Sequence, residues 1–228
     1  MNTKKQVFLT GSLAFLVLTG LRLHAAEDMT RFVARSGSKM RIDGTANMIH
    51  THWAVESPLI GGFLDAGPGF PTEPGQPATP GKVAAKAEVF VTVRSLKSVE
   101  DDGKPYSEDM DRVMYEHLKA PQNPKIAFHL TDLTLKETAA SKDAPYVFEA
   151  KGQLAVAGVT NDVTMPINIT PLGDKKLKIS GKTSLKMTDF KVEPPNPLGL
   201  GIKTGDEIKI IFDWMVAQRT TPAAAAAK

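Results

Sequence analysis

The sequence has 228 residues, of which 42% are hydrophobic and 23% are charged, and it contains no cysteine. This length fits one large domain or two small ones, and the hydrophobic fraction is sufficient for a buried core, which excludes wholesale disorder. Without cysteine the chain has no disulfide framework, thiol nucleophile, Cys-ligated metal or lipid anchor on cysteine.

The first residues have the layout of a signal peptide. Lys4 and Lys5 precede a short apolar run, and small residues follow at Ala25 and Ala26. We therefore predict a Sec-type signal peptide over 1–26, cleaved after Ala25 or Ala26. The mature protein is then periplasmic or secreted and is not an integral membrane protein. An uncleaved membrane anchor is the alternative, although glycine and serine interrupt the run and make it a marginal span.

The net charge of +3 belongs to this leader. Residues 1–26 hold three of the 28 Lys and Arg residues and no acidic residue, which leaves 25 basic against 25 acidic residues in the rest of the chain. The mature chain is therefore near neutral, and we predict no nucleic-acid partner.

From about Lys39 onward, apolar residues recur at every second position, which is the period of a strand with one buried and one wet face. The runs, separated by turns, predict seven or eight antiparallel strands in a barrel or sandwich. In chain order the runs are Met40–Met48, Val83–Val93, Ile126–Leu130, Phe148–Val156, Val163–Ile169, Leu177–Met187 and Ile208–Val216. Pro166 lies inside one run and predicts an edge, a bulge or a strand start.

One segment has the period of a helix. Ser107 can cap its N-terminus and Pro121 stops it. Its apolar face consists of Met110, Val113, Met114 and Leu118. We expect this helix to cap a barrel mouth or to pack on the outside of the strands.

Proline and glycine gather in two other segments. Residues 61–81 and 193–205 are predicted to be long loops without regular structure. The alanine-rich residues 219–228 predict a frayed, disordered tail. The chain shows no repeat and no domain boundary, so we predict one domain over 39–218.

The residues do not predict catalysis. Ser180–Thr183 ends like a phosphate loop but lacks its first glycine, and it lies within strand alternation. The sequence contains no G-x-S-x-G motif, so it does not predict the nucleophilic serine of a hydrolase. His50 and His52 share one face of a strand, as metal ligands can, but a third and fourth ligand are not evident nearby. From the residues alone we predict an exported all-β domain with no catalytic residue, metal or cofactor.

Three passages, in this order and spacing, resemble the YceI-like family, the polyisoprenoid- or lipid-binding YceI-like domain. The first is Gly152–Thr160 followed by Val163–Ile167. The second is His117–Phe128, and the third is Met187–Phe190 followed by Gly205–Ile210. The resemblance covers nearly the whole mature chain. The proline-rich insertion at 61–81 and the Pro194–Pro197 loop depart from the family pattern, and both are expected to reshape a barrel entrance.

The resemblance implies a lipocalin-like antiparallel β-barrel of about eight strands with one short helix, whose interior holds a long isoprenoid chain. A barrel of this size is just wide enough for one slim ligand. We predict that apolar strand residues line the tunnel and that two helix methionines line its mouth. The predicted lipid-binding residues are Val89, Val91, Val93, Met110, Met114, Phe128, Leu154, Val156, Met165, Ile167, Met187, Ile210, Phe212 and Trp214.

Other interpretations stay open at this point. A carrier of a fatty acid or amide, or a structural module with a filled core, would have the same strand pattern. A hydrolase or isomerase of an apolar substrate would act through His50, His52 or loop carboxylates. The sequence also leaves the oligomeric state open, including a homodimer formed through an edge strand near Pro166.

Overall fold

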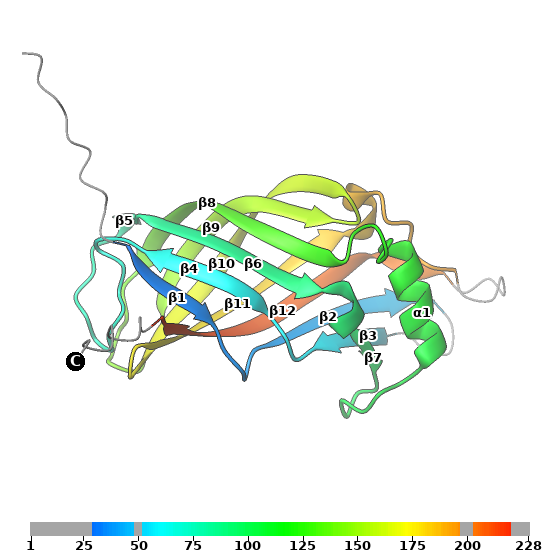
Figure 1. Ribbon diagram of the computed structural model, residues 1–228, viewed down its shortest axis with the longest axis horizontal. Helices are drawn as coiled ribbons and strands as arrows, with labels where there is room; N and C mark the ends of the chain where they lie inside the picture. The colour runs from blue at the N-terminus through cyan, green and yellow to red at the C-terminus, as the bar shows by residue number, and fades with distance from the viewer. Residues whose placement is uncertain (1–28, 48–51, 197–202, 220–228) are drawn as a thin grey trace, which may run out of the picture.

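The computed structural model describes residues 29–47, 52–196 and 203–219, so the predicted signal peptide lies outside it. These residues form an antiparallel barrel with one α-helix at one end (Figure 1). The strands are β1 (Thr30–Ala34), β2 (Lys39–Ala46), β3 (His52–Ser57), β4 (Gly61–Ala66), β5 (Gly81–Lys82), β6 (Ala85–Thr92), β7 (Lys97–Val99), β8 (Lys125–Glu137), β9 (Tyr146–Val156), β10 (Val159–Gly173), β11 (Lys176–Lys186) and β12 (Thr204–Gln218). The helix is α1 (Glu108–His117), and two 3₁₀ turns are η1 (Val93–Ser95) and η2 (Met187–Phe190).

The barrel closes because β12 pairs back onto β1. Around the ring the order is β1-β4-β6-β8-β9-β10-β11-β12. At three places in the ring the wall consists of two consecutive strands, namely β1 with β2, β4 with β3, and β6 with β7. The strands β2, β3 and β7 pair with one another and continue the wall toward α1. The long strand β12 pairs with both β2 and β1: its residues up to Asp213 pair with β2, and those from Val216 onward pair with β1. The prediction of an all-β, lipocalin-like barrel of about eight strands is confirmed.

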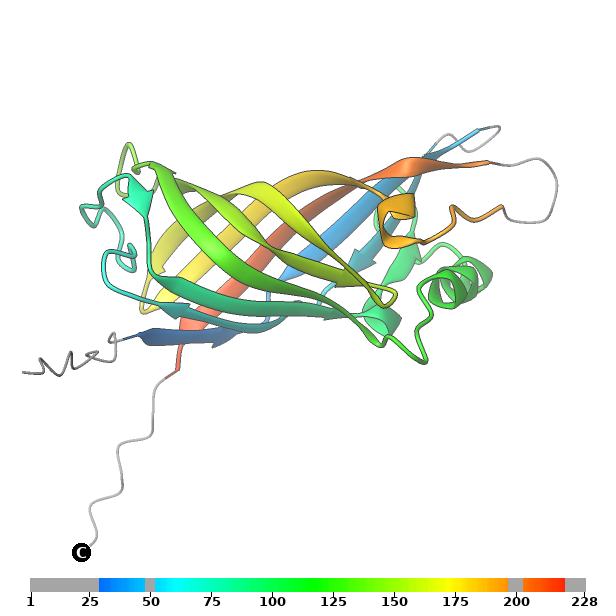
Figure 2. The same cartoon turned by 90° about the horizontal axis from the view of Figure 1, so that it is seen from above.

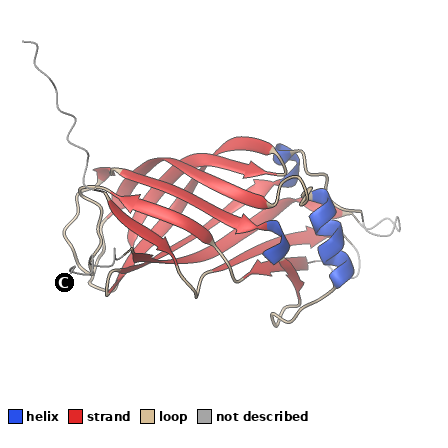
Figure 3. Cartoon of the chain, in the orientation of Figure 1, coloured by secondary structure: helices blue, strands red, loops and turns tan. Residues whose placement is uncertain are grey.

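Alternation along each strand decides which side chains enter the barrel. In β11, Leu177 and Ile179 are buried inside the barrel, whereas Lys176 and Lys182 are exposed outside it. Figure 3 shows that α1 and both 3₁₀ turns gather at one end, while the strands run through to the other end. The two ends therefore have different structures.

The proline-rich segment forms the end opposite α1, as the view in Figure 2 also shows. The prediction that 61–81 is one irregular loop is wrong, because Gly61–Ala66 forms β4 and Gly81–Lys82 forms β5. Backbone pairing of β4 with both β1 and β6 overrides the local tendency of its glycines to form a loop. The remaining residues close this end of the barrel, so the expected effect on an entrance is wrong for this insertion. Pro195 of the second proline-containing loop, in contrast, lines the cavity described below.

Phe70 in this segment plugs the closed end. Its side chain is 2% exposed, and its ring stacks on Phe148 with 5.8 Å between centroids. The Tyr146 hydroxyl donates a 2.5 Å hydrogen bond to the carbonyl oxygen of Gln76, which ties the same segment to β9. The proline-rich segment is thus part of the core.

Several predicted boundaries also change. The barrel starts at Thr30 instead of Lys39, because β1 completes the ring. Gly205 belongs to β12 and not to the preceding loop. Arg219 donates its backbone N–H to the carbonyl of Arg31, so the ordered wall continues into the predicted tail, whose other residues lie outside the description. Pro166 lies where β10 loses β11 as a partner, since their pairing starts at Ile167.

We predict that Phe70→Ala lowers the free energy of unfolding by about 3–5 kcal/mol, because it leaves a cavity beneath Phe148. Urea denaturation followed by circular dichroism measures this loss. Leu59→Ala is the control, since Leu59 is 61% exposed and its removal should change stability by less than about 0.5 kcal/mol. Equal effects of the two substitutions would show that the segment does not close the core.

Candidate functional site

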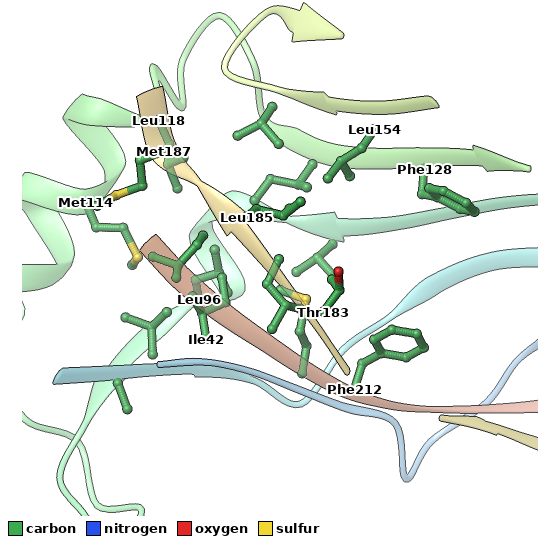
Figure 4. A pocket seen from close by; sticks show the side chains of 18 of the residues that line it. Ile42, Leu96, Met114, Leu118, Phe128, Leu154, Thr183, Leu185, Met187 and Phe212 are labelled. Carbon is green, nitrogen blue, oxygen red and sulfur yellow. The ribbon is translucent and has the colours of Figure 1, made fainter. Parts of the chain in front are cut away.

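The half of the barrel nearest α1 encloses a cavity of about 940 Å³. This volume lies toward the upper end of the range of about 300–1,000 Å³ for small-molecule sites. Figure 4 shows its wall, where aliphatic, aromatic and methionine side chains from many strands converge. Ile42, Phe128, Leu154, Leu185 and Phe212 are among them. Such a wall can hold an apolar molecule through burial alone.

The cavity ends on a packed floor. Leu133, Ile179 and Trp214 line its deep end and are themselves buried. Beyond them the barrel is filled by large side chains that do not border the cavity, including Tyr146 and Phe148. An eight-stranded barrel can be filled by its own side chains, and here one half is filled while the other is hollow.

The helix α1 caps the hollow end. The predicted cap is confirmed, because the Ser107 hydroxyl accepts a 3.4 Å hydrogen bond from the backbone N–H of Met110. The helix begins at Glu108 and its last residue is His117, so it stops before Pro121. The apolar face of the helix lines the cavity, which decides between the two expected placements. That face consists of Met110, Val113, Met114 and Leu118.

Polar contacts anchor α1 to β7. The Asp111 carboxylate, which is buried, accepts a 2.6 Å hydrogen bond from the backbone N–H of Ser98 and lies 3.0 Å from Lys97 Nζ. The hydrogen bond with Asp111, followed by one with Tyr115, raises the pKa of Lys97. The Tyr115 hydroxyl also donates to the carbonyl of Leu96 at 2.7 Å. Sequence reasoning missed Asp111, because a helix acid normally faces water.

The passages that resemble a known family meet at the opposite side of the same rim. Ala157, Phe190 and Val192 form a small buried cluster against Leu118 and Met187. The end of α1 thereby contacts both the β9–β10 turn and the η2 segment. Residues far apart in the chain build one edge of the mouth.

Hydrogen bonds hold η2 in this position. The Asp206 carboxylate accepts from the backbone N–H of Thr188 at 2.9 Å and from its hydroxyl at 2.6 Å. These bonds hold the pKa of Asp206 below its usual range. Asn161 donates to the carbonyl of Asp189 at 2.7 Å, and a 2.8 Å hydrogen bond joins His117 Nδ1 to the carbonyl of Glu193.

Thirteen of the predicted residues line this cavity, and one does not. Val93 is the first residue of η1, and its side chain is 1% exposed but does not line the cavity. Met187, predicted on a strand, lies in η2 and still borders the cavity. The others in the wall are Val89, Val91, Met110, Met114, Phe128, Leu154, Val156, Met165, Ile167, Ile210, Phe212 and Trp214. Their contact with a lipid stays a prediction.

Sequence reasoning also missed parts of the wall. Trp53 and Val55 on β3 line the cavity, as do Leu96, which follows η1, and Phe190, which is the last residue of η2. The short period-two run of β3 could have indicated the first two. The other two carry no local signal, because only the tertiary fold brings these connections over the mouth.

Few polar groups face the inner cavity. The Thr183 side chain lies between Leu185 and Phe212 in Figure 4. Trp214 Nε1 is buried without a hydrogen-bond partner in the described part of the chain. Charged residues such as Asp101 and Lys186 border the cavity near α1 and are exposed.

The histidines do not form a metal site in the part of the structure that can be described. His52 is exposed and borders the cavity, whereas His50 lies outside the described residues. His129 lies on the outer face of β8, and its Nδ1 is 3.9 Å from the Glu88 carboxylate. Within the described ranges, groups of three or more potential metal-binding side chains are absent. Helices long and apolar enough to cross a bilayer are likewise absent from those ranges.

The described residues thus form a closed antiparallel barrel around a cavity with a mainly apolar wall, which places the protein in the class of lipocalin-like barrels. A model of the YceI-like domain matches residues 40–216, and the chain therefore belongs to the YceI-like family.

Solved structures share this fold. A polyisoprenoid binding domain from Saccharophagus degradans, implicated in plant cell wall breakdown, has a TM-score of 0.61 and 9% identity over 84% of this chain and 99% of that one. BcnA from Burkholderia cenocepacia has a TM-score of 0.54 and 14% identity over 78% and 96% of the two chains. At these identities the likeness concerns the fold alone. A comparison with curated proteins found no match.

We predict that Phe212→Ala impairs ligand retention more than it impairs folding. Removing a phenylalanine ring from a packed core lowers the free energy of unfolding by about 3–5 kcal/mol. Because the Phe212 ring borders the cavity, its removal should lower it by less. Phe148→Ala is the matched control, because Phe148 is 0% exposed and lies beneath the floor. Urea unfolding and the amount of co-purified lipid measure the two effects. Equal stability losses with unchanged lipid content would place Phe212 in an ordinary core.

Proposed function

We propose that this protein is an exported carrier, store or scavenger that holds a polyisoprenoid or isoprenoid-quinone-like chain in the barrel. The apolar cavity of about 940 Å³ carries this proposal. Its packed floor and its helix-capped mouth suit a molecule that enters from the α1 end. The Saccharophagus degradans domain with the same fold is described as polyisoprenoid binding, which supports the same ligand class.

The energetics require a chain of several units. Burying one five-carbon isoprene unit contributes on the order of 3–4 kcal/mol as an upper bound. Association costs about 4–15 kcal/mol, so about four or five units offset even the upper end of that range. A single short prenyl group would therefore bind weakly, whereas a longer chain binds without a hydrogen bond.

A binding role without catalysis fits the arrangement of polar groups. Asp111, Asp206 and Ser98 are engaged in the hydrogen bonds that hold the rim together. The inner wall carries aliphatic and aromatic side chains at the positions where an enzyme would place an acid, base or nucleophile. We therefore propose a binding protein and not a hydrolase or isomerase.

Mass spectrometry of the protein purified without detergent from the envelope of an exporting cell tests the proposal. We expect a stoichiometric polyisoprenoid or isoprenoid quinone in the organic extract. The intact mass should correspond to a chain that begins at Ala26 or Glu27, as export and cleavage require. A mature protein without a bound apolar molecule, which also fails to take up geranylgeraniol, would contradict the proposed ligand. A full-length mass would contradict cleavage.

Intrinsic fluorescence gives an independent test in solution. The chain has two tryptophans, Trp53 and Trp214, and both line the cavity. We expect saturable changes in their emission when delipidated protein is titrated with geranylgeraniol. The change should persist in Trp53→Phe, because Trp214 lies at the deep end. An emission spectrum that does not change when geranylgeraniol is added would show that the alcohol does not enter the interior of the barrel.

A further inference from the structure

Three glycines on the inner face of the barrel lie beneath aromatic rings. Gly44 is directly opposite Trp53, and Gly181 is directly opposite Phe212. On β9, Gly152 lies under the ring of Phe128 from β8. All three aromatic residues line the cavity, and both phenylalanines are labelled in Figure 4.

The rings occupy the space that a side chain at each glycine would need. A Cβ atom built on Gly181 would lie 2.6 Å from Phe212 Cζ, and one on Gly152 would lie 2.5 Å from Phe128 Cζ. Real Cβ atoms essentially never approach that closely. Each ring therefore rests on the bare backbone of the neighbouring strand.

Backbone conformation does not account for these glycines. The glycines with positive φ are others, such as Gly62 and Gly158, so alanine would be compatible with the backbone at 44, 152 and 181. Glycine inside a strand weakens it and often marks a close approach of other groups. The close approach here is that of a ring to the wall.

We propose that Gly44, Gly152 and Gly181 are specificity-determining residues that keep the lumen wide enough for a methyl-branched chain. With glycine beneath it, a ring lies against the sheet. With a larger residue there, the sheet backbone blocks one side and the ring must move toward the open cavity. This inference rests on the proposed function and adds which residues select the class of chain.

The expected selection follows from the shape of the chain. An isoprenoid carries a methyl branch on every repeating unit, whereas an unbranched alkyl chain has the thickness of its methylene groups. A ring displaced into the lumen narrows it, and overpacking a close-fitting site is unfavourable. The branched chain should therefore lose more affinity than the straight chain when one glycine is replaced.

Gly181→Ala is the sharpest test, because the atoms closest to the added Cβ belong to side chains only, those of Phe212 and Ile167. At Gly152 the added atom would also meet the backbone oxygen of His129, which would strain the strand itself.

The outer face of the barrel offers a matched control. Gly61 is directly opposite Phe90, and a Cβ at Gly61 would lie 2.5 Å from Phe90 Cζ. Although Phe90 borders the cavity, strand alternation places its ring outside with Glu88, under Lys125 Nζ at 4.0 Å from its centroid. Gly61→Ala thus creates the same ring displacement on the other side of the wall.

The experiment titrates delipidated wild type, Gly181→Ala and Gly61→Ala with geranylgeraniol and with a straight-chain alcohol of equal carbon number, followed by tryptophan fluorescence. For Gly181→Ala we expect about tenfold weaker binding of geranylgeraniol, which corresponds to about 1.4 kcal/mol, and a change of less than about threefold for the straight chain. Gly61→Ala should bind both alcohols like the wild type. In Gly181→Ala/Phe212→Leu, the smaller side chain should restore much of the preference for the branched chain.

The outcomes separate this inference from the function on which it rests. Wild type that binds neither alcohol would contradict the proposed function. Wild type that binds geranylgeraniol, with Gly181→Ala indistinguishable from Gly61→Ala, would overturn the role of the glycines alone. Equal losses for both alcohols in Gly181→Ala would also overturn it, because the glycine would then affect the cavity without selecting the chain.

Discussion

The packing of Phe70 and Phe148 at one end of the barrel is the contact on which the rest of the structure depends. An eight-stranded barrel has room for its own side chains or for a slim ligand along any part of its length. Here large buried side chains near the proline-rich segment, including Phe70 and Phe148, pack one half of the barrel. The cavity exists because that filling stops at Leu133, Ile179 and Trp214. The packed core and the open cavity thus occupy different halves of the barrel along its axis.

The hollow half needs support that its own interior does not supply. Polar contacts around the rim provide it, with Asp111 attaching α1 to β7 and Asp206 attaching η2 to β12. The buried carboxylate of Asp111 is compensated by a backbone N–H and by Lys97, as a buried charge must be. These polar groups stabilise the rim, so the inner wall does not need polar side chains and can remain apolar.

Much of the fold and of the cavity wall was predictable from the sequence. Phe128, Leu154 and Phe212 are partly buried and border the cavity, and their period of two already placed them on inward faces. Strand β4 was not predictable, because its two glycines favour a loop until β1 and β6 pair with them. The prediction that Val93 lines the cavity was wrong for a similar reason, because β6 ends at Thr92 and Val93 begins η1.

By itself, the sequence determined the all-β class, the inward and outward faces, the cap of α1 and the family, because alternation, capping and motif spacing are local properties. Only the tertiary structure decided which inward faces fill the core and which surround open space. It also decided that the proline-rich segment closes one end and that α1 covers the other. Those outcomes depend on contacts between segments distant in the chain, such as Phe70 with Phe148 and Gly181 with Phe212, and local sequence carries no information on the distance between them.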